Sequence, residues 1–408
     1  MGESNGSLRV MQEKDEHRFI LPMPLESTPM NLKNSNQVVT IGLLLVVDDR
    51  SDLALVAKCL VSSLPLADSW CIVDLRDDQT DLKSLLEETF ADMPGGVVDG
   101  RQMDRAAAQS EGLTRLRKSS DYSLLLAEST EVCFDLDYNV VALKATLNRS
   151  AYRLTTKSGS RHCAQLALLN NAYEFYFRGA AVPMLDCHDT VESVGHIDGV
   201  FFEEDSPTDQ RSADEVAALE SAFSTEPDRL LRAHFASVIA RAHSEMGQYS
   251  KAQAWFEQVV QLGNSGDEIC EALLRAGHCA RDLLRPSSEV LDLYMRAHDA
   301  NPHRAEPLYY AARVLREDNR LSLAHLFAQA ALKKAQPEIV NCLETDVYDW
   351  KALFEFSFVA YYVGDHQAGF NACKELLTNP ALSEADRMLT RKNLNHYIRA
   401  LTDSESAG

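Results

Sequence analysis

The chain has 408 residues, a formal net charge of −21 and an isoelectric point of about 5.0. A chain this acidic repels nucleic acids and anionic membranes unless it carries a local basic patch. Its densest basic stretch, Arg115-Leu-Arg117-Lys118, is short. Composition therefore argues against nucleic-acid binding, and the length predicts two or three domains of ~150 residues each.

The ends and the cysteines predict a cytoplasmic protein. Residues 1–36 are polar and lack the apolar core of a signal peptide, so we expect a flexible arm. The longest apolar run, Val38 to Val47, is shorter than the roughly 20 residues that span a bilayer, so no membrane span is expected. The nine cysteines show no C-x-x-C spacing. This predicts reduced, buried thiols rather than a disulfide framework.

The segment 37–205 alternates apolar runs with helical patterns. The runs are VVTIGLLLVVDD at 38–49, WCIVDL at 70–75 and YSLLLA at 122–127, and helical patterns cover 53–64 and 82–90. Near-continuous apolar runs are typical of strands that are buried on both faces, and this alternation predicts an α/β domain with a mostly parallel sheet. Ligands bind such sheets at the carboxyl ends of the strands. Those ends carry the acids Asp48, Asp74 and Glu128.

From 213 to 402 the chain is almost wholly helical in pattern. The stretch 240–259 has glycine, alanine and aromatic residues at the offsets of a tetratricopeptide repeat, and 311–332 repeats the scheme. Ser383-Glu-Ala-Asp386 resembles a capping box that opens a final helix, and a polar terminal helix would close the end of a helical stack. The pattern predicts an all-α solenoid.

This order of domains resembles the bacterial family-two glycosyltransferases of GT-A fold that are fused to tetratricopeptide repeats. The resemblance covers roughly residues 38–400 and is strongest at 291–316 and 344–366. It implies a nucleotide-diphosphate-sugar site with a divalent metal, Mn²⁺ or Mg²⁺, held by a D-x-D motif. Asp74 matches the aspartate that contacts the nucleoside, and Asp81 matches the acid that ends the following loop.

Three functional elements of that family are altered in this chain. Ala127-Glu128-Ser129 stands in place of D-x-D, Ala108-Gln109-Ser110 in place of Ala-Arg-Asn, and Val182-Pro183 in place of a His-Glu pair. Alanine cannot ligate a metal, so only Glu128 and Glu131 remain near the expected metal position. The departures predict that the family's chemistry is impaired or lost.

Two readings of the nucleotide-site acids stay open. In the first, a nucleotide-sugar is bound by Asp48, Asp74 and Asp81. If the protein is active, Glu128 and Glu131 hold Mn²⁺ or Mg²⁺, and if it is inactive no cofactor is expected. In the second, Asp74 and Asp81 are loop acids that cap the following helix.

Other candidates are weaker. Asp186-Cys-His-Asp189 with His196 has too few ligands at recurrent spacing for a convincing zinc site. Tyr309, Tyr310, Tyr361 and Tyr362 are candidate contacts on the solenoid, although adjacent pairs on a helix usually place one residue in the core.

Two functions follow from this sequence. The first is a glycosyltransferase-like protein whose repeats bind a protein partner or acceptor, as an accessory subunit in a homo- or hetero-oligomer. The second is an active glycosyltransferase that moves a sugar from a nucleotide-diphosphate sugar to a protein or glycan acceptor. Whether the protein is an enzyme is left open by the residues themselves.

Overall fold

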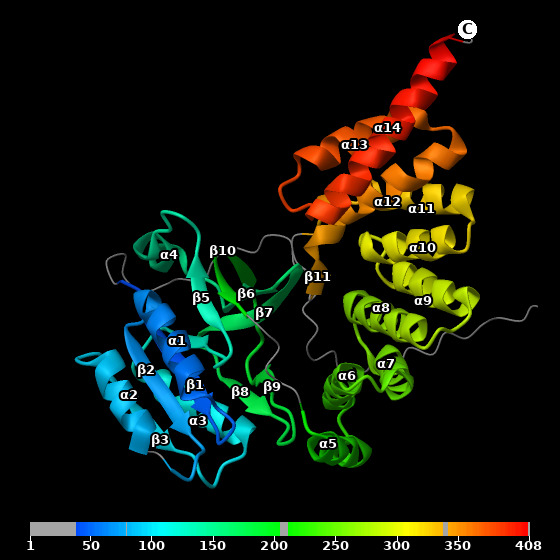
Figure 1. Ribbon diagram of the computed structural model, residues 1–408. Coiled ribbons are helices and arrows are strands. Elements are labelled where there is room, and N and C mark those ends of the chain that lie inside the picture. Colours follow the sequence, from blue (N-terminus) through cyan, green and yellow to red (C-terminus); the bar gives the residue numbers. More distant parts are fainter. Residues whose placement is uncertain (1–37, 79, 205–210, 338–341, 407–408) are drawn as a thin grey trace, which may run out of the picture.

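The computed structural model describes residues 38–78, 80–204, 211–337 and 342–406. The arm expected at 1–36 lies outside the described residues. An α/β domain built around one large sheet is followed by a stack of helices that lies beside it (Figure 1). No helix of the described residues combines the length and the apolar character needed to cross a membrane.

The large sheet is mixed, with a parallel half and a largely antiparallel half. Its strand order is β3-β2-β1-β4-β7-β6-β10-β5. The first four are parallel, β7 runs antiparallel to both β4 and β6, and β10 is parallel to β6 and antiparallel to β5. A separate two-stranded sheet pairs β8 (Phe175–Arg178) with β9 (Met184–Cys187). The bounds of the main strands are β1 Ile41–Val47, β2 Ser69–Asp74, β3 Gly95–Asp99, β4 Tyr122–Leu125, β5 Glu131–Phe134, β6 Ala151–Ser158, β7 Arg161–Asn170 and β10 Val194–Glu203.

The apolar run of β1 is buried on both faces because helices cover both sides of the sheet. Leu43 and Leu45 pack with the helices α1 (Leu53–Ser63) and α2 (Thr80–Phe90). Leu44 and Val46, on the opposite face, pack with α3 (Arg105–Leu116). The mostly parallel α/β arrangement predicted for the strands at 38–49, 70–75 and 122–127 is present. A short helix, α4 (Val140–Thr146), follows β5.

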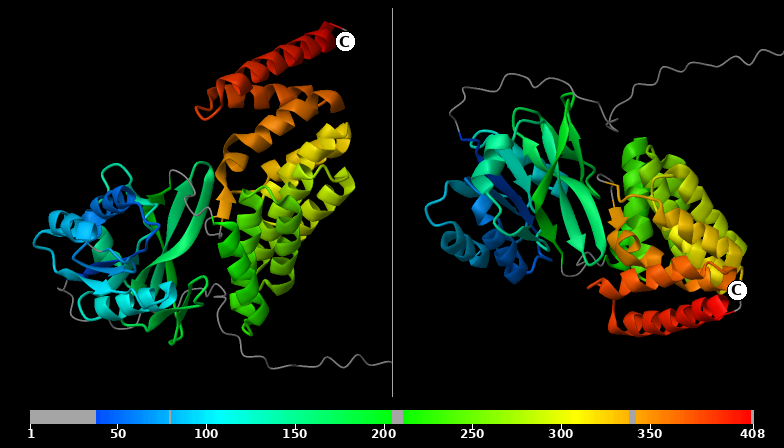
Figure 2. Two further views of the ribbon diagram at one scale, coloured as in Figure 1. Left: turned by 60° about the horizontal axis from the view of Figure 1, so that its bottom comes forward. Right: turned by 90° about the horizontal axis from the view of Figure 1, so that it is seen from above.

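The second half is a stack of antiparallel helices, which continues to the C-terminal end of the described chain (Figure 2). Small residues allow the helices to approach closely. Gly277 on α8 is an example, since a Cβ there would lie 2.4 Å from the Tyr294 ring on α9. The helices are α5 Ala213–Thr225, α6 Arg229–Glu245, α7 Tyr249–Leu262, α8 Gly266–Asp282, α9 Ser287–Ala300, α10 Glu306–Glu317, α11 Leu321–Leu332, α12 Ala352–Val359, α13 His366–Thr378 and α14 Glu384–Ser406.

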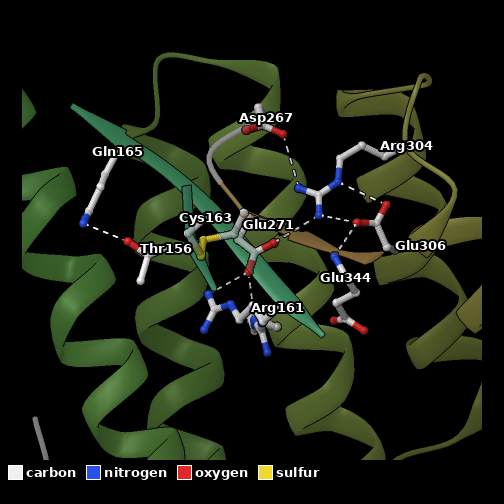
Figure 3. The surroundings of a disulfide bond; sticks show 11 residues. Thr156, Arg161, Cys163, Gln165, Asp267, Glu271, Arg304, Glu306 and Glu344 are labelled. Carbon is white, nitrogen blue, oxygen red and sulfur yellow. Dashed lines mark hydrogen bonds and ion pairs between the residues drawn. A yellow bond between two sulfur atoms is a disulfide. The ribbon is translucent and has the colours of Figure 1, made fainter. Parts of the chain in front are cut away.

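The prediction of an all-α second half is wrong at one place. Residues Cys342–Glu344, between α11 and α12, form strand β11, which pairs antiparallel with β7 and so joins the sheet of the first domain. Cys163 on β7 faces Cys342 in this pairing, and the two form a disulfide (Figure 3). The expectation of reduced thiols therefore fails for these two cysteines. Seven others are free, and six of those are buried.

Several side-chain contacts also join the two halves. Val182, which follows β8, packs into the core of the helical stack beside Leu231. Among the described residues, the ion pairs Arg50–Glu215, Arg161–Glu271 and Arg178–Asp228 cross the junction. Together with β11 and the disulfide, these contacts fix the helical stack onto the α/β domain.

Candidate functional site

Two neighbouring parallel strands end in the same Asp-x-Arg turn. At the end of β2, Arg76 donates three hydrogen bonds to the Asp74 carboxylate. They come from the Arg76 backbone N–H at 3.1 Å and from its Nε and Nη2 at 3.0 Å each. At the end of β3, Asp99 accepts from Arg101 in the same way, at 3.2, 3.0 and 2.6 Å. Asp74 and Asp99 are register partners in the sheet. Each carboxylate is thus held by the guanidinium two residues later.

The strand next to them, β1, ends in a related turn. Asp48 accepts from the backbone N–H of Arg50 at 3.0 Å and pairs with its side chain at 3.4 Å. Arg105, at the start of α3, donates at 2.6 Å to Oδ2 of Asp48, the oxygen that the Arg50 side chain also contacts. Burial raises the pKa of Asp48, but the Arg50 backbone hydrogen bond and the two arginines outweigh it, so the pKa lies below its ordinary value. Asp48 is therefore a paired anion.

Two of the predicted nucleotide-site acids, Asp74 at the end of β2 and Asp81 after it, lie in different environments. The Asp74 side chain is completely buried under Arg76. Asp81 is exposed in the first turn of α2, where a negative charge interacts favourably with the helix dipole. The position of Asp81 agrees with the alternative of a loop acid at a helix start. Nucleotide binding by Asp48, Asp74 and Asp81 stays a prediction.

The two candidate metal ligands follow β4, with Glu128 in the loop and Glu131 as the first residue of β5. Thr130 closes this loop by donating from its hydroxyl to the Ala127 carbonyl at 2.7 Å. Glu131 pairs with Lys58 of α1 at 2.8 Å. Glu128 is half-buried, and its Oε2 is buried without a hydrogen-bond partner among the described residues. The described residues contain no group of three or more His, Cys, Asp or Glu side chains that could hold a metal ion.

The two other altered elements have structural roles here. Ser110, on α3, accepts a hydrogen bond from the Phe177 backbone N–H at 2.8 Å and so ties α3 to β8. Val182 is buried against α6 near Phe235, at the junction with the helical stack. At these two positions the chain therefore has a helix–strand contact and an interdomain apolar contact.

The remaining sequence candidates are resolved as follows. In the Asp186–Asp189 stretch, Asp186 pairs with Arg178 at 2.8 Å, and His188 stacks on Tyr176 with ring centroids 4.1 Å apart. Tyr309 and Tyr310 are both buried in the helical core, whereas Tyr361 and Tyr362 are exposed on the short helix η3 (Ala360–Val363). The aromatic run at 173–177 leads into strand β8.

Asp48 and Asp74 were predicted as strand-end acids, but strand β3 with its terminal Asp99 and the three arginines were missed. Arg50, Arg76 and Arg101 each follow a strand-end aspartate by two residues, a spacing that is visible in the sequence. A carboxylate two residues before a flexible cation readily forms a local hydrogen-bonded turn. The threefold Asp-x-Arg recurrence was the available signal that these carboxylates are paired.

Comparisons with known proteins give little information about the function of this chain. No family model matches the chain, and no curated protein matches it. Among solved structures it is similar to "MamA RS-1 ArsTM double mutant" (16% identity, 40% of this chain and 82% of that chain covered, TM-score 0.32). It is also similar to "Crystal structure of MamA" (13%, 40% and 86%, 0.33) and to "MamA 41-end from Desulfovibrio magneticus RS-1" (12%, 43% and 96%, 0.31). At these TM-scores the likeness gives no functional information about this chain.

Proposed function

We propose that this protein is a binding scaffold, in which a glycosyltransferase-like α/β domain and a helical stack form one platform for a protein partner. The observation that carries the proposal is the pairing of the strand-end acids. Asp74 and Asp99 are each held by the arginine two residues later, and Asp48 is held by Arg50 and Arg105. A carboxylate already paired with a guanidinium has lost much of its capacity to accept hydrogen bonds from a nucleotide or to ligate a cation.

The attachment of the two domains supports the same proposal. The face of the stack that meets the α/β domain is covered by β7, β11 and the contacts around the disulfide. Helical-repeat proteins commonly bind partners on such surfaces. Because this chain occupies part of that surface itself, a partner would need another part of the stack.

The last repeats offer the surface that a partner would use. Helix η3 exposes three consecutive apolar residues, with 38% of Tyr361, 58% of Tyr362 and 37% of Val363 accessible to solvent. Tyrosine is enriched in protein–protein interfaces, because it combines a large apolar surface with a polar hydroxyl. We therefore place the partner contact at η3.

One observation favours the alternative, an active glycosyltransferase. Oε2 of Glu128 is buried and has no hydrogen-bond partner within the described residues. An unsatisfied carboxylate oxygen is costly, and a bound metal or substrate hydroxyl would satisfy it. In that case Mn²⁺ or Mg²⁺ would be held there with oxygens from the substrate diphosphate.

Calorimetric titration with UDP and GDP, each with and without Mn²⁺, separates the two functions. The scaffold predicts no measurable heat in any of the four titrations. Metal-dependent binding that is abolished by Glu128→Gln would overturn it and establish a working nucleotide site. Asp198→Asn is a matched control, because Asp198 is an exposed acid on β10.

The partner surface is tested with the double variant Tyr361→Ser/Tyr362→Ser. We expect that proteins which co-purify with the wild-type chain no longer co-purify with this variant under identical conditions. Leu284→Ser is the control, because Leu284 is 90% exposed and lies between α8 and α9, away from η3. Equal loss with the control, or no loss with the double variant, contradicts a partner site at η3.

A further inference from the structure

A pocket with a volume of about 320 Å³ lies where the two domains meet. This volume is within the roughly 300 to 1,000 Å³ that is usual for small-molecule sites. It shares no residue with the nucleotide-sugar set predicted from the sequence. The turn between β6 and β7, the helices α8 and α10, and strand β11 supply its lining residues, which are Ser160, Arg161, Arg275, His278, Tyr310 and Glu344.

One wall of the pocket carries two guanidinium groups from different domains. Arg161 of β7 and Arg275 of α8 both donate to the same oxygen, Oε1 of Glu271, at 3.2 and 2.9 Å (Figure 3 shows the Arg161 contact). The other oxygen of Glu271 accepts from Arg304 at 3.4 Å. A guanidinium has five N–H donors, so one shared oxygen satisfies only a small part of the capacity of Arg161 and Arg275.

The hydrogen-bond donors of this wall are incompletely used. Nε of Arg161 is buried and has no hydrogen-bond partner among the described residues. Burial lowers the pKa of Arg161, and the neighbouring Arg275 lowers it further. A buried donor without a partner, and two guanidinium groups that share one carboxylate oxygen, leave donors that an anion in the pocket would satisfy.

The opposite wall carries the acid Glu344, whose carboxylate is already paired with neighbouring side chains of the same wall. Oε2 of Glu344 accepts from the Tyr310 hydroxyl at 2.5 Å, and Oε1 lies 3.9 Å from Nε2 of His278. The rings of His278 and Tyr310 pack edge to face, with centroids 4.4 Å apart. Burial acts to raise the pKa of Glu344, but His278, Tyr310 and Arg275 bring it down to about 2. Glu344 is therefore a fixed part of the wall, and Arg161 and Arg275 remain as the ligand-binding donors.

We propose that this pocket binds the oxyanion of a small molecule, a phosphoryl or carboxylate group, between Arg161 and Arg275. The guanidinium matches such groups because its N–H donors form a planar fork that engages two oxygens at once. A ligand held in this way bridges the α/β domain and the helical stack. The proposal is independent of the scaffold function proposed above.

A ligand that binds the folded protein but not the unfolded chain stabilises the folded state. This stabilisation grows with the logarithm of the ligand concentration and raises the unfolding temperature. The test therefore measures thermal unfolding of the full chain in inorganic phosphate and in acetate, against sodium chloride at matched ionic strength. We expect a concentration-dependent rise in the unfolding temperature with phosphate beyond the effect of chloride. A rise with acetate as well assigns carboxylates to the site, and a rise with phosphate alone assigns phosphoryl groups.

Three variants connect the effect to the pocket. Arg161→Gln and Arg275→Gln should each weaken the apparent affinity at least tenfold. Arg281→Gln should behave as the wild type, because Arg281 lies on the same helix but pairs with Glu317 outside the pocket. Circular dichroism checks that each variant is folded. If Arg275→Gln fails to fold, Arg161→Gln still tests the pocket, because Arg161 lies on β7 and its substitution does not change helix α8.

Three results would overturn the proposal. They are no stabilisation by either anion beyond that of chloride, unchanged stabilisation in Arg161→Gln, and an equal loss of stabilisation in Arg281→Gln.

Discussion

Asp74 and Arg76 form a bidentate ion pair that is almost entirely buried at the end of β2. The side chains are 1% and 10% exposed. One strand further, Asp99 and Arg101 repeat the arrangement with side chains that are about half exposed. The same motif thus occurs side by side in a buried and an exposed form.

This pair of motifs gives the first prediction. Arg76→Gln should lower the free energy of unfolding by about 3 kcal/mol, because it leaves the Asp74 carboxylate buried without its partner. Arg101→Gln should change it by less than about 1 kcal/mol, because water replaces the lost partner. Urea denaturation of both variants measures the difference. Similar losses of unfolding free energy in Arg76→Gln and Arg101→Gln would show that the burial of Asp74 does not increase the contribution of its ion pair to stability.

A second prediction concerns the disulfide. Under denaturing, non-reducing conditions an alkylating reagent should modify seven of the nine cysteines, and all nine after reduction. Mass spectrometry counts the modifications. A serine substitution at both Cys163 and Cys342 should remove the difference, while Cys133→Ser should retain it. Modification of all nine without a reductant would restore the expectation of reduced thiols and support a cytoplasmic location, which stays a prediction.

A third prediction concerns His234, which is half-buried in the helical stack on α6. Burial lowers its pKa to about 4, and Arg241 contributes to the lowering. The folded state therefore binds this proton less readily than the unfolded state, whose histidine pKa is about 6.5. The resulting stability is present above pH ~6.5 and is lost as the pH falls through the folded pKa near 4.

The variant His234→Gln isolates this contribution. The free energy of unfolding of the wild type, measured relative to this variant by urea titration, should fall by roughly 3 kcal/mol between pH 7 and pH 4. His303→Gln provides the comparison, since His303 is exposed. A relative stability that stays constant over this range would mean that His234 is not held neutral by burial.

The fourth prediction tests the close packing of α8 and α9. Gly277→Ala should destabilise the helical stack by about 1–3 kcal/mol, because the added methyl overlaps the Tyr294 ring. Gly96→Ala is a suitable control, since a Cβ at Gly96 meets nothing within 4 Å. Denaturation followed by circular dichroism reports the loss of helix. A neutral Gly277→Ala would imply that Tyr294 has room to move aside.

The local elements could be predicted because their signals are local. The apolar runs became β1, β2 and β4, and the helical pattern at 53–64 became α1. One half of the predicted capping box at Ser383 is present, since Ser383 Oγ accepts from the Asp386 backbone N–H at 3.1 Å. Buried strands and helix starts depend on neighbours within a few residues, so composition and spacing identify them.

Strand β11 and the junction pocket could not be predicted in this way. Three residues are too few to show an alternating pattern, and Cys342 pairs with a strand 179 positions earlier. Nothing near Cys342 in the sequence specifies that partner. The same limit applies to the candidate site. The acids of the strand ends were visible, but only the fold shows that Asp74 is buried under Arg76 and that Arg161 reaches α8.

The disulfide also determines how the protein would respond to mechanical force. Cys163 and Cys342 close a covalent ring that contains helices α5 to α11, and both ends of the described chain lie outside it. Tension applied between those ends passes across the sulfur bridge and bypasses the enclosed helices. In the oxidised protein a pull would extend only the segments outside the ring. Reduction would add the contour length of about 179 residues to the extension, so the thiol state sets how far this molecule stretches.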